Sequence, residues 1–296
     1  MKILVTGAGG LLGSRIVKLA SERGYEVYGL YLNHPPSMGF KIKMDITDFN
    51  GVEKLISQLK PHAIIHCAAI TDVDLCERNR DLAFKVNYEA TKIIAKASEK
   101  VDAHMIYIST DYVFDGSRGM YREEDRPNPI NTYGLTKLLG EMAVMENCGR
   151  SLIVRASVIY GSKPAAGKVN FALWVMEKLK SGERIKVLKD QYVSPTLNTN
   201  LALMILDALE MDLTGVMHMS GATRVSRYEF AIQIARKFNL DEGLIEETYM
   251  NEMSWTARRP RDSSLDVSKA SRNLNVKPIS LNESLEKLYW ELMGDA

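Results

Sequence analysis

Short apolar runs alternate with helical segments through the first half of the chain. The run from Ala63 to Ala69 is almost continuous, which is typical of a parallel strand that helices cover on both faces. Strands are predicted over residues 3–6, 25–30, 63–69, 104–109 and 152–156, and helices over 14–20, 49–60, 86–100 and 135–147. This order predicts an α/β fold with a doubly wound parallel sheet of the Rossmann type.

The alternation loosens after Tyr160 and Gly161. Helices are predicted beyond this point over residues 171–180, 200–210, 226–238 and 280–293, and strands over 184–188 and 215–219. Ser226 and Glu229 form the capping-box pattern that opens one of these helices. We therefore expect a smaller, partly interleaved α/β substrate-binding cap. The predicted division assigns residues 1–160 and about 189–217 to a dinucleotide-binding domain, and about 161–188 and 218–296 to the cap.

A glycine-rich turn follows the first predicted strand and opens the first predicted helix. Its spaced glycines are Gly7, Gly10 and Gly13. Gly7 permits a tight turn, Gly10 lets the backbone approach a pyrophosphate, and Gly13 lets the helix lie close to the strand. The helix N-terminus adds partial positive charge. The turn therefore predicts a dinucleotide-binding site.

The end of the second predicted strand bears on the choice of cofactor. An acidic residue there hydrogen-bonds the adenosine ribose in NAD-dependent proteins, but this chain has Asn33 with no acid beside it. The missing acid leaves room for the 2′-phosphate of NADP(H), although no arginine stands there to bind it. We predict NADP(H), with Asn33 among the binding residues, and NAD(H) stays open.

Two further segments are predicted to contact the cofactor. Asp45 follows the third apolar run, where a carboxylate can accept a hydrogen bond from the adenine amino group. The alternative for this segment is that Asp48 caps the next helix, and both interpretations can hold for different residues. Ala68 and Ala69 end the strand over residues 63–69, and their small side chains let a flat ring pass close by.

A tyrosine, a lysine and a threonine form the candidate catalytic set. Tyr133 and Lys137 are four residues apart, so that on a helix the phenol and the ammonium share one face. The spacing alone proves little, because Tyr88 and Lys92 repeat it, and we interpret that second pair as an ordinary helix contact. Thr110 distinguishes the first pair, because it stands at the carboxyl end of a predicted strand, where open α/β sheets bind ligands.

These three groups suit the reduction of a carbonyl. A nicotinamide cofactor carries the hydride in such a reaction, and Tyr133 would donate a proton to the carbonyl oxygen. A free phenol has a pKa of about 10, so the ammonium of Lys137 is expected to stabilise the phenolate and to hold the nicotinamide ribose. Thr110 would position the carbonyl. Its neighbour Ser109 points to the opposite side of the strand, so only one of the two is expected to face the substrate.

The motifs resemble those of the extended short-chain dehydrogenase/reductases, and more closely those of the dTDP-4-dehydrorhamnose reductases. The resemblance runs over nearly the whole chain, with the pieces in the family's order. It rests on the glycine turn, on Thr110, Tyr133 and Lys137, and on residues 109–116, 128–134, 191–196 and 257–260. It implies NAD(P)H-dependent reduction at C4 of a nucleotide-linked keto sugar, giving dTDP-L-rhamnose.

The resemblance also implies further site residues. Cofactor positions fall on Gly10, Leu11, Leu12, Asp45, Ile46, Ala69, Ile70 and Thr71, with Tyr133 and Lys137, and substrate positions on Thr110 and Asp111. Tyr112 falls where the family has an aromatic residue near the substrate, with core packing as the alternative. Arg258 and Arg259 are expected to neutralise a pyrophosphate, unless they form a solvated charged surface. Val158 departs from the family, which often has Trp there, so the sugar and the nucleotide base stay open.

Two other functions stay open. A non-catalytic regulatory subunit, like that of methionine adenosyltransferase, shares this fold and similar motifs. A pure regulator, however, has no need of Thr110, Tyr133 and Lys137 together. An epimerase or dehydratase of the same superfamily would regenerate its cofactor during the reaction.

Composition bears on the remaining classes of function. The 296 residues include 38 basic and 37 acidic side chains, for a formal net charge of +1, so we expect no nucleic-acid partner. His62 and His66 are four apart on a predicted strand, which does not favour a metal site. No signal peptide precedes the first strand and no apolar run reaches the length of a membrane helix, so we expect a cytoplasmic protein. A nucleotide sugar is the expected partner, and a homodimer stays open.

Overall fold

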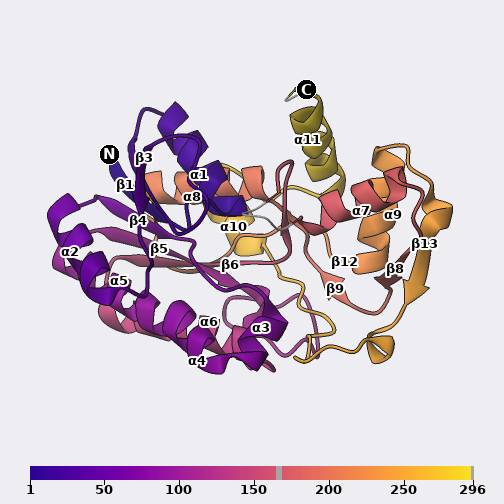
Figure 1. The fold of residues 1–296 in the computed structure, drawn as a ribbon, viewed down its shortest axis with the longest axis horizontal. Helices are drawn as coiled ribbons and strands as arrows, with labels where there is room; N and C mark the ends of the chain where they lie inside the picture. The colour runs from indigo at the N-terminus through magenta and orange to yellow at the C-terminus, as the bar shows by residue number, and fades with distance from the viewer. Residues whose placement is uncertain (165–168, 295–296) are drawn as a thin grey trace.

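The computed structural model describes residues 1–164 and 169–294 and contains the predicted sheet (Figure 1). Seven parallel strands lie in the order β11-β6-β5-β4-β1-β2-β3. They are β1 (Lys2–Thr6), β2 (Glu26–Tyr31), β3 (Phe40–Lys43), β4 (Ala63–His66), β5 (His104–Thr110), β6 (Ser151–Ala156) and β11 (Gly215–His218). The strand order reverses between β1 and β4, which confirms the doubly wound Rossmann fold.

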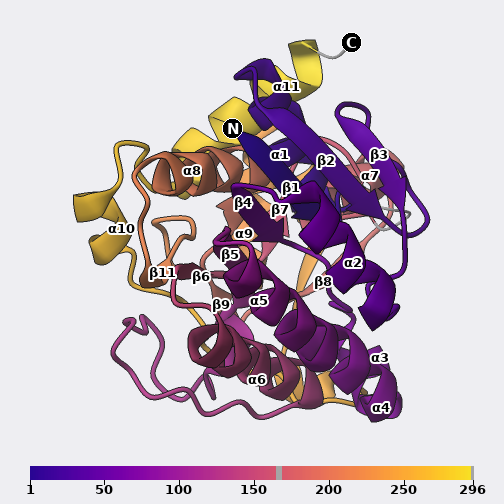
Figure 2. The same ribbon diagram turned by 90° about the vertical axis from the view of Figure 1, so that its left-hand side faces the viewer.

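Helices cover both faces of this sheet. One face carries α1 (Leu11–Glu22), α8 (Asn198–Glu210) and α10 (Ser268–Asn273), and the other carries α2 (Phe49–Leu59), α5 (Ala90–Lys100) and α6 (Thr132–Asn147). Successive strand residues point to opposite faces, so Ile3 and Val5 of β1 pack towards α1 whereas Leu4 packs towards α2. Figure 2 shows α2, α5 and α6 along one side of the strands.

The helix predicted over residues 86–100 is a π-helical turn (Lys85–Glu89) followed by α5. The short helices α3 (Val73–Arg78) and α4 (Arg80–Phe84) precede it. Helix α6 begins at Thr132, three residues before the predicted start, because the side chain of Asn131 accepts a hydrogen bond from the backbone N–H of Gly134. Tyr133 therefore lies in the first turn of α6.

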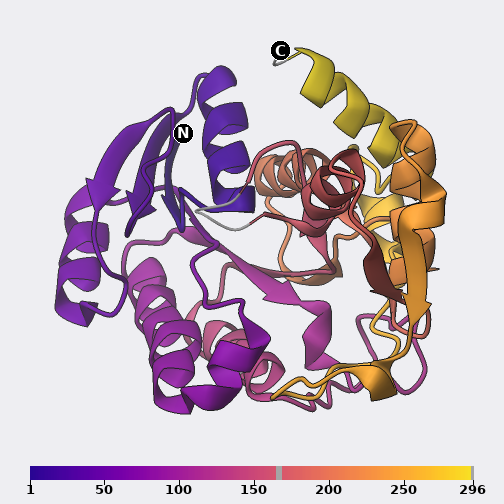
Figure 3. The same cartoon turned by 45° about the vertical axis from the view of Figure 1, so that its right-hand side comes forward.

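A smaller lobe packs around its own apolar core, on the side of the molecule away from α2 (Figures 1 and 3). It contains α7 (Phe171–Lys180), β8 (Ile185–Leu188), α9 (Arg227–Lys237), β13 (Ile245–Thr248) and α11 (Leu281–Gly294). Strand β13 pairs in parallel with β8. The sequence did not predict β13, because two glutamates occupy its middle and hide its apolar pattern. The capping box of Ser226 and Glu229 at the start of α9 is confirmed.

Short pairs of strands join the two lobes. They are β7 (Ile159–Tyr160) with β10 (Thr196–Leu197), and β9 (Tyr192–Val193) with β12 (Val225–Ser226). Helix α10 belongs to the segment assigned to the cap, yet its Ala270 and the following Leu274 pack on the sheet core. The division into two domains stays a prediction.

None of the helices in the described part of the chain has both the length and the apolar character needed to cross a bilayer.

Candidate active site

The glycine turn packs directly on the loop that follows β4, at the reversal of strand order. Gly7 has a φ of +64°, and a Cβ there would lie 2.7 Å from the backbone nitrogen of Ala68. A Cβ on Gly13 would lie 2.3 Å from the carbonyl oxygen of Gly7. Side chains at these two positions would force the backbone apart. The glycines therefore hold α1 close to β1 and bring the two loops together.

This turn fits the pyrophosphate of a dinucleotide. Gly10 is the N-cap residue of α1 and provides no side-chain acceptor for the first backbone N–H groups of the helix. Such N–H groups, with the positive end of the helix dipole, form a site for a phosphate. Leu11 begins the helix, and the side chain of Leu12 packs in the sheet core.

The loop after β2 rests on the glycine turn. A Cβ on Gly9, which the sequence motif does not single out, would lie 1.8 Å from the carbonyl oxygen of His34. The neighbouring Asn33 is exposed. Asn33 therefore lies in a loop that contacts the turn, as a residue near the adenosine ribose should.

The two aspartates after β3 have different roles. Asp48 caps α2, because its side chain accepts a hydrogen bond from the backbone N–H of Gly51 at 3.0 Å. Asp45 accepts two hydrogen bonds from Thr47, from the backbone N–H at 2.8 Å and from the hydroxyl at 2.9 Å. Ile46 is buried in the core beneath them. The capping interpretation is confirmed for Asp48, and the adenine contact of Asp45 stays a prediction.

A buried asparagine, which the sequence did not reveal, holds the loop after β4. Asn87 lies in the π-helical turn and accepts a hydrogen bond from the backbone N–H of Ile70 at 2.8 Å. Its Nδ2 donates to the carbonyl of Ile70 at 3.1 Å and to the hydroxyl of Thr136 at 3.2 Å. π-Helical turns occur often at functional sites. Asn87 thus connects the predicted cofactor loop, which includes Ala69 and Thr71, to the helix that carries Lys137.

The structure brings Thr110, Tyr133 and Lys137 together at the carboxyl end of β5. Thr110 is the last residue of that strand, and its hydroxyl lowers the pKa of the nearby phenol of Tyr133. The buried Nζ of Lys137 donates to the carbonyl oxygen of Ile108 at 2.7 Å and lies 4.0 Å from the ring centroid of Tyr107. The strand end and the first turns of α6 therefore supply all three predicted groups.

Desolvation shifts the pKa values of Tyr133 and Lys137 in opposite directions. It raises the pKa of the Tyr133 phenol above its ordinary value, and the hydrogen bond with Thr110 opposes the rise. Burial lowers the pKa of Lys137 to about 7, and the negative charge of Glu141 opposes the fall. A phenol with a raised pKa keeps its proton at neutral pH, as a proton donor must.

Ser109 points away from this site into a buried charged cluster. Its hydroxyl donates to Glu141 at 2.5 Å, and Arg155 donates to both oxygens of the same carboxylate, at 3.0 and 2.7 Å. The side chains of this ion pair are 0% and 5% exposed. Ser109 therefore helps to hold α6 against the sheet through Glu141, and Thr110 is the hydroxyl on the site's side of β5.

Asp111 holds three segments together beside the candidate catalytic set. Its carboxylate is buried and accepts hydrogen bonds from the hydroxyls of Thr110 at 3.0 Å, Ser157 at 2.8 Å and Ser263 at 2.5 Å. Burial raises the pKa of Asp111, and the three hydroxyl donors oppose the rise. Asp111 is thus placed to orient Thr110.

Tyr112 is buried next to Tyr133. Its ring is 9% exposed and meets the ring of Tyr133 edge-on, with centroids 5.9 Å apart. Burial raises its pKa, and the charges of Arg227 and Arg259 oppose the rise. Tyr112 is therefore packed, as the core interpretation expects, and its contact with the substrate stays a prediction. Arg227, the first residue of α9, is a site candidate that the sequence did not single out.

The two predicted pyrophosphate arginines differ in their surroundings. Arg259 donates to both oxygens of Asp74 on α3, at 2.9 and 2.8 Å, and lowers the pKa of Asp74 to about 2. Arg258 is exposed, and its carbonyl oxygen accepts a hydrogen bond from Asn131 at 2.9 Å. Arg259 is therefore held in place by a two-point ion pair, whereas the side chain of Arg258 lies in solvent.

Val158 has an uncommon backbone conformation. Its φ is +39°, in a region that β-branched residues rarely adopt. The carbonyl oxygen of Val158 accepts a hydrogen bond from the backbone N–H of Thr196 at 3.1 Å, and the preceding Ser157 contacts Asp111. These contacts hold the strained residue close to Asp111.

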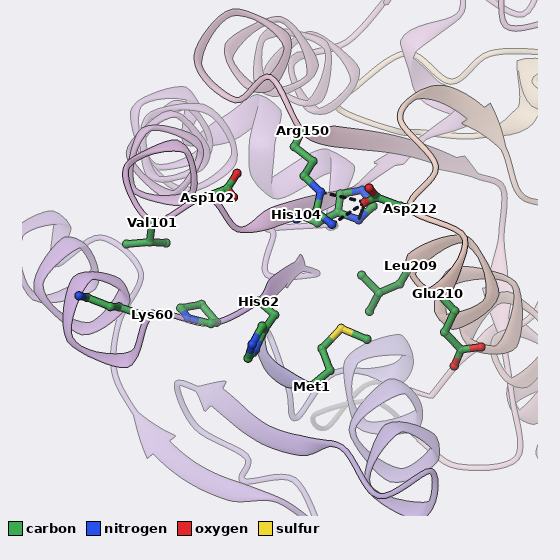
Figure 4. A pocket seen from close by; sticks show the side chains of 11 residues that line it. Met1, Lys60, His62, Val101, Asp102, His104, Arg150, Leu209, Glu210 and Asp212 are labelled. Atoms are coloured by element: carbon green, nitrogen blue, oxygen red, sulfur yellow. Dashed lines mark hydrogen bonds and ion pairs between the residues drawn. The ribbon is translucent and has the colours of Figure 1, made fainter.

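A cavity of about 480 Å³ lies at the opposite edge of the sheet (Figure 4). Its lining includes His62 and His104, which stand at the amino ends of β4 and β5. His104 is buried with Asp212 at 3.4 Å, and Arg150 contacts the same carboxylate at 2.8 Å. Open α/β sheets bind their ligands at the carboxyl ends of the strands, so this cavity lies away from the candidate active site.

A family model and several known proteins match nearly the whole chain. A family model described as "RmlD substrate binding domain" matches residues 1–293. The chain is 36% identical to a probable low-salt glycan biosynthesis reductase, Agl14, of Haloferax volcanii, over 97% of each protein. It is 33% identical to methionine adenosyltransferase 2 subunit beta of Bos taurus, over 90% of this chain and 81% of that protein.

A solved structure is also similar over the whole fold. The dTDP-4-dehydrorhamnose reductase of Bacillus anthracis, in complex with NADP, is 34% identical to this chain. The match covers 98% of this chain and 100% of that one, with a TM-score of 0.89.

Proposed function

The chain belongs to the RmlD substrate-binding domain family of the extended short-chain dehydrogenase/reductases, and on this premise we propose that it reduces the 4-keto group of a nucleotide-linked sugar with NAD(P)H. The finer proposal is the dTDP-4-dehydrorhamnose reductase reaction, which forms dTDP-L-rhamnose. The meeting of Thr110, Tyr133 and Lys137 at the end of β5 carries this proposal. The NADP complex of the Bacillus anthracis reductase supports it.

The residues around the glycine turn fit the cofactor. When bound, NAD(P)H supplies the hydride. The backbone N–H groups at the start of α1 would hold its pyrophosphate, because Gly10 offers them no side-chain acceptor. The loop that contains Ala69 and Ile70, held by Asn87, would contact the nicotinamide end.

The side chains of this chain divide the remaining work. Tyr133 donates its proton to the sugar oxygen, and its raised pKa means that the proton is present at neutral pH. Lys137, with a pKa of about 7, is partly charged at that pH and stabilises the phenolate by its positive charge. Thr110, which donates its hydroxyl hydrogen to Asp111 in this structure, would donate it to the carbonyl oxygen of the bound substrate and so align the carbonyl.

The test is turnover with purified components. We expect the absorbance of NADPH to fall when dTDP-4-dehydrorhamnose is added, with dTDP-L-rhamnose as the product. An epimerase or dehydratase would convert its substrate without consuming NADPH. Absence of both NADPH oxidation and sugar conversion would reject the reductase proposal.

A regulatory subunit is the second candidate, because the chain is 33% identical to methionine adenosyltransferase 2 subunit beta. Stable association with a catalytic methionine adenosyltransferase subunit, together with no turnover of the keto sugar, would favour this candidate. Size-exclusion chromatography of the mixed proteins measures the association. The intact set of Thr110, Tyr133 and Lys137 favours the reductase.

The choice between cofactors can be tested at Asn33. We propose a preference for NADP(H), because the loop after β2 presents an amide and no carboxylate near the glycine turn. Asn33→Asp should raise the KM for NADPH about tenfold or more relative to that for NADH, because the new carboxylate repels a 2′-phosphate and can bind a free ribose hydroxyl. Asn33→Ala, which removes the amide without adding charge, is the control. Equal changes for the two cofactors in Asn33→Asp would contradict the assignment.

A further inference from the structure

A second cavity lies on the smaller lobe and is lined by the 3₁₀ turn η4 (Met250–Glu252) and the segment that follows it. Its volume is about 280 Å³. Pockets that enclose a whole drug-sized ligand begin at roughly 300 Å³. The cavity therefore suits one part of a larger ligand.

The walls of this cavity suit a flat aromatic group. Met250, Met253 and Trp255 form the apolar part, and Arg258 and Arg259 form one edge. The indole of Trp255 is partly exposed and has the guanidinium of Arg259 on it, 5.0 Å from the ring centroid. Methionine side chains adapt to the shape of a bound group, and tryptophan offers a large flat face for stacking.

The arginine edge connects the cavity to the active site. Arg259 is paired with Asp74 on α3, and its charge also acts on Tyr112, whose ring meets that of Tyr133. The carbonyl oxygen of Arg258 is bonded to Asn131, which caps the helix that carries Tyr133. Figure 1 shows this segment running from the smaller lobe towards α3. The order in space is thus the candidate catalytic set, then the two arginines, then the aromatic cavity.

A nucleotide sugar has the same order of chemical groups, namely the sugar, the diphosphate and the base. We propose that the cavity is the nucleobase subsite, in which the base stacks on Trp255 while the diphosphate lies beside Arg258 and Arg259. This inference rests on the proposed function, because it takes the sugar to lie at Tyr133. It assigns the choice of base to the segment that contains Met250, Met253 and Trp255, and leaves the choice of sugar to the residues around Thr110 and Val158.

The experiment measures binding of nucleoside diphosphates to the full-length protein by calorimetry. The probes are dTDP, UDP, CDP and GDP, with inorganic pyrophosphate as the probe that lacks a base. Trp255→Ala should raise the Kd of the best-bound nucleotide about tenfold or more, which is the usual effect of removing an aromatic ring under a stacked base. Trp255→Phe should keep most of the affinity. Binding of pyrophosphate should be the same in all three proteins.

A matched control is Trp290→Ala, because Trp290 is 64% exposed on α11. Equal nucleotide affinity in Trp255→Ala and Trp290→Ala would overturn the inference, as would equal weakening of pyrophosphate and nucleotide in Trp255→Ala. Absence of binding of all four nucleotides to the wild-type protein would also overturn it. The calorimetric experiment measures nucleotide binding and does not depend on turnover. A protein that binds nucleotides through Trp255 but shows no reductase activity would therefore reject the proposed function and leave the nucleobase subsite standing.

Discussion

Replacement of Tyr133 by phenylalanine removes the proposed proton donor and little else. The ring keeps its edge contact with Tyr112, whose centroid lies 5.9 Å away. The variant loses at most the interaction of the phenol with the hydroxyl of Thr110, and a hydrogen bond is worth about 0.5–1.5 kcal/mol of stability. The fold should therefore persist, and Tyr133→Phe is a test of chemistry.

The expected effect on the rate is much larger than the effect on stability. A positioned general acid contributes roughly 100- to 10,000-fold, which corresponds to about 2.7–5.4 kcal/mol in the activation barrier. The raised pKa of Tyr133 makes it a protonated donor across the neutral range. Cofactor affinity should change little, because Lys137 and the glycine turn are untouched.

The assay follows NADPH oxidation at saturating keto sugar, with NADPH binding measured separately by fluorescence. Tyr88→Phe is the matched control, because Tyr88 repeats the spacing with Lys92, whose Nζ lies 6.0 Å from its ring centroid, on a different helical segment. The control should keep the wild-type kcat. A Tyr133→Phe protein that binds both ligands and keeps kcat within about tenfold of wild type would refute the assignment of the proton donor.

Two further predictions concern buried charges. Lys137→Met should stabilise the cofactor-free protein by about 5 kcal/mol at most at pH 7 and below, since the folded-state pKa is about 7 against an ordinary 10.5. From pH 7 to 10.5 the unfolded wild-type protein binds more protons than the folded one, so the free energy of unfolding of the wild type rises with pH. The stability difference between Lys137→Met and the wild type should therefore shrink over this range. A stability difference that does not change with pH in urea unfolding would contradict this prediction. Arg155→Met should cost about 3–5 kcal/mol of stability, because it leaves the buried Glu141 carboxylate without its arginine partner. The double variant with Glu141→Leu should recover much of that loss in the same urea measurement, and no recovery would argue against charge burial as the cause.

Much of the fold was predictable because its signals are local. A strand covered on both faces shows an apolar run, as Ala63–His66 does, and each helix shows the spacing of its buried face. Gly7 and Gly13 were identifiable because the turn demands residues without a Cβ, and the contacts at 2.7 and 2.3 Å explain the demand. Elements with polar centres, such as β13, carry no such signal.

The residues of the candidate site also fall into those that have a local signal in the sequence and those that have none. The sequence by itself determined that the Tyr133 phenol and the Lys137 ammonium share a helix face, because they are four residues apart. It also determined that the hydroxyl of Thr110 stands at the end of a strand, because an apolar run ends there. Only the tertiary structure decided which groups surround them. Asn87 reaches Ile70 from a π-helical turn, and Arg259 meets an aspartate 185 positions away. These contacts join segments distant in the chain, and no periodicity encodes them, because they depend on how packed elements are placed relative to one another.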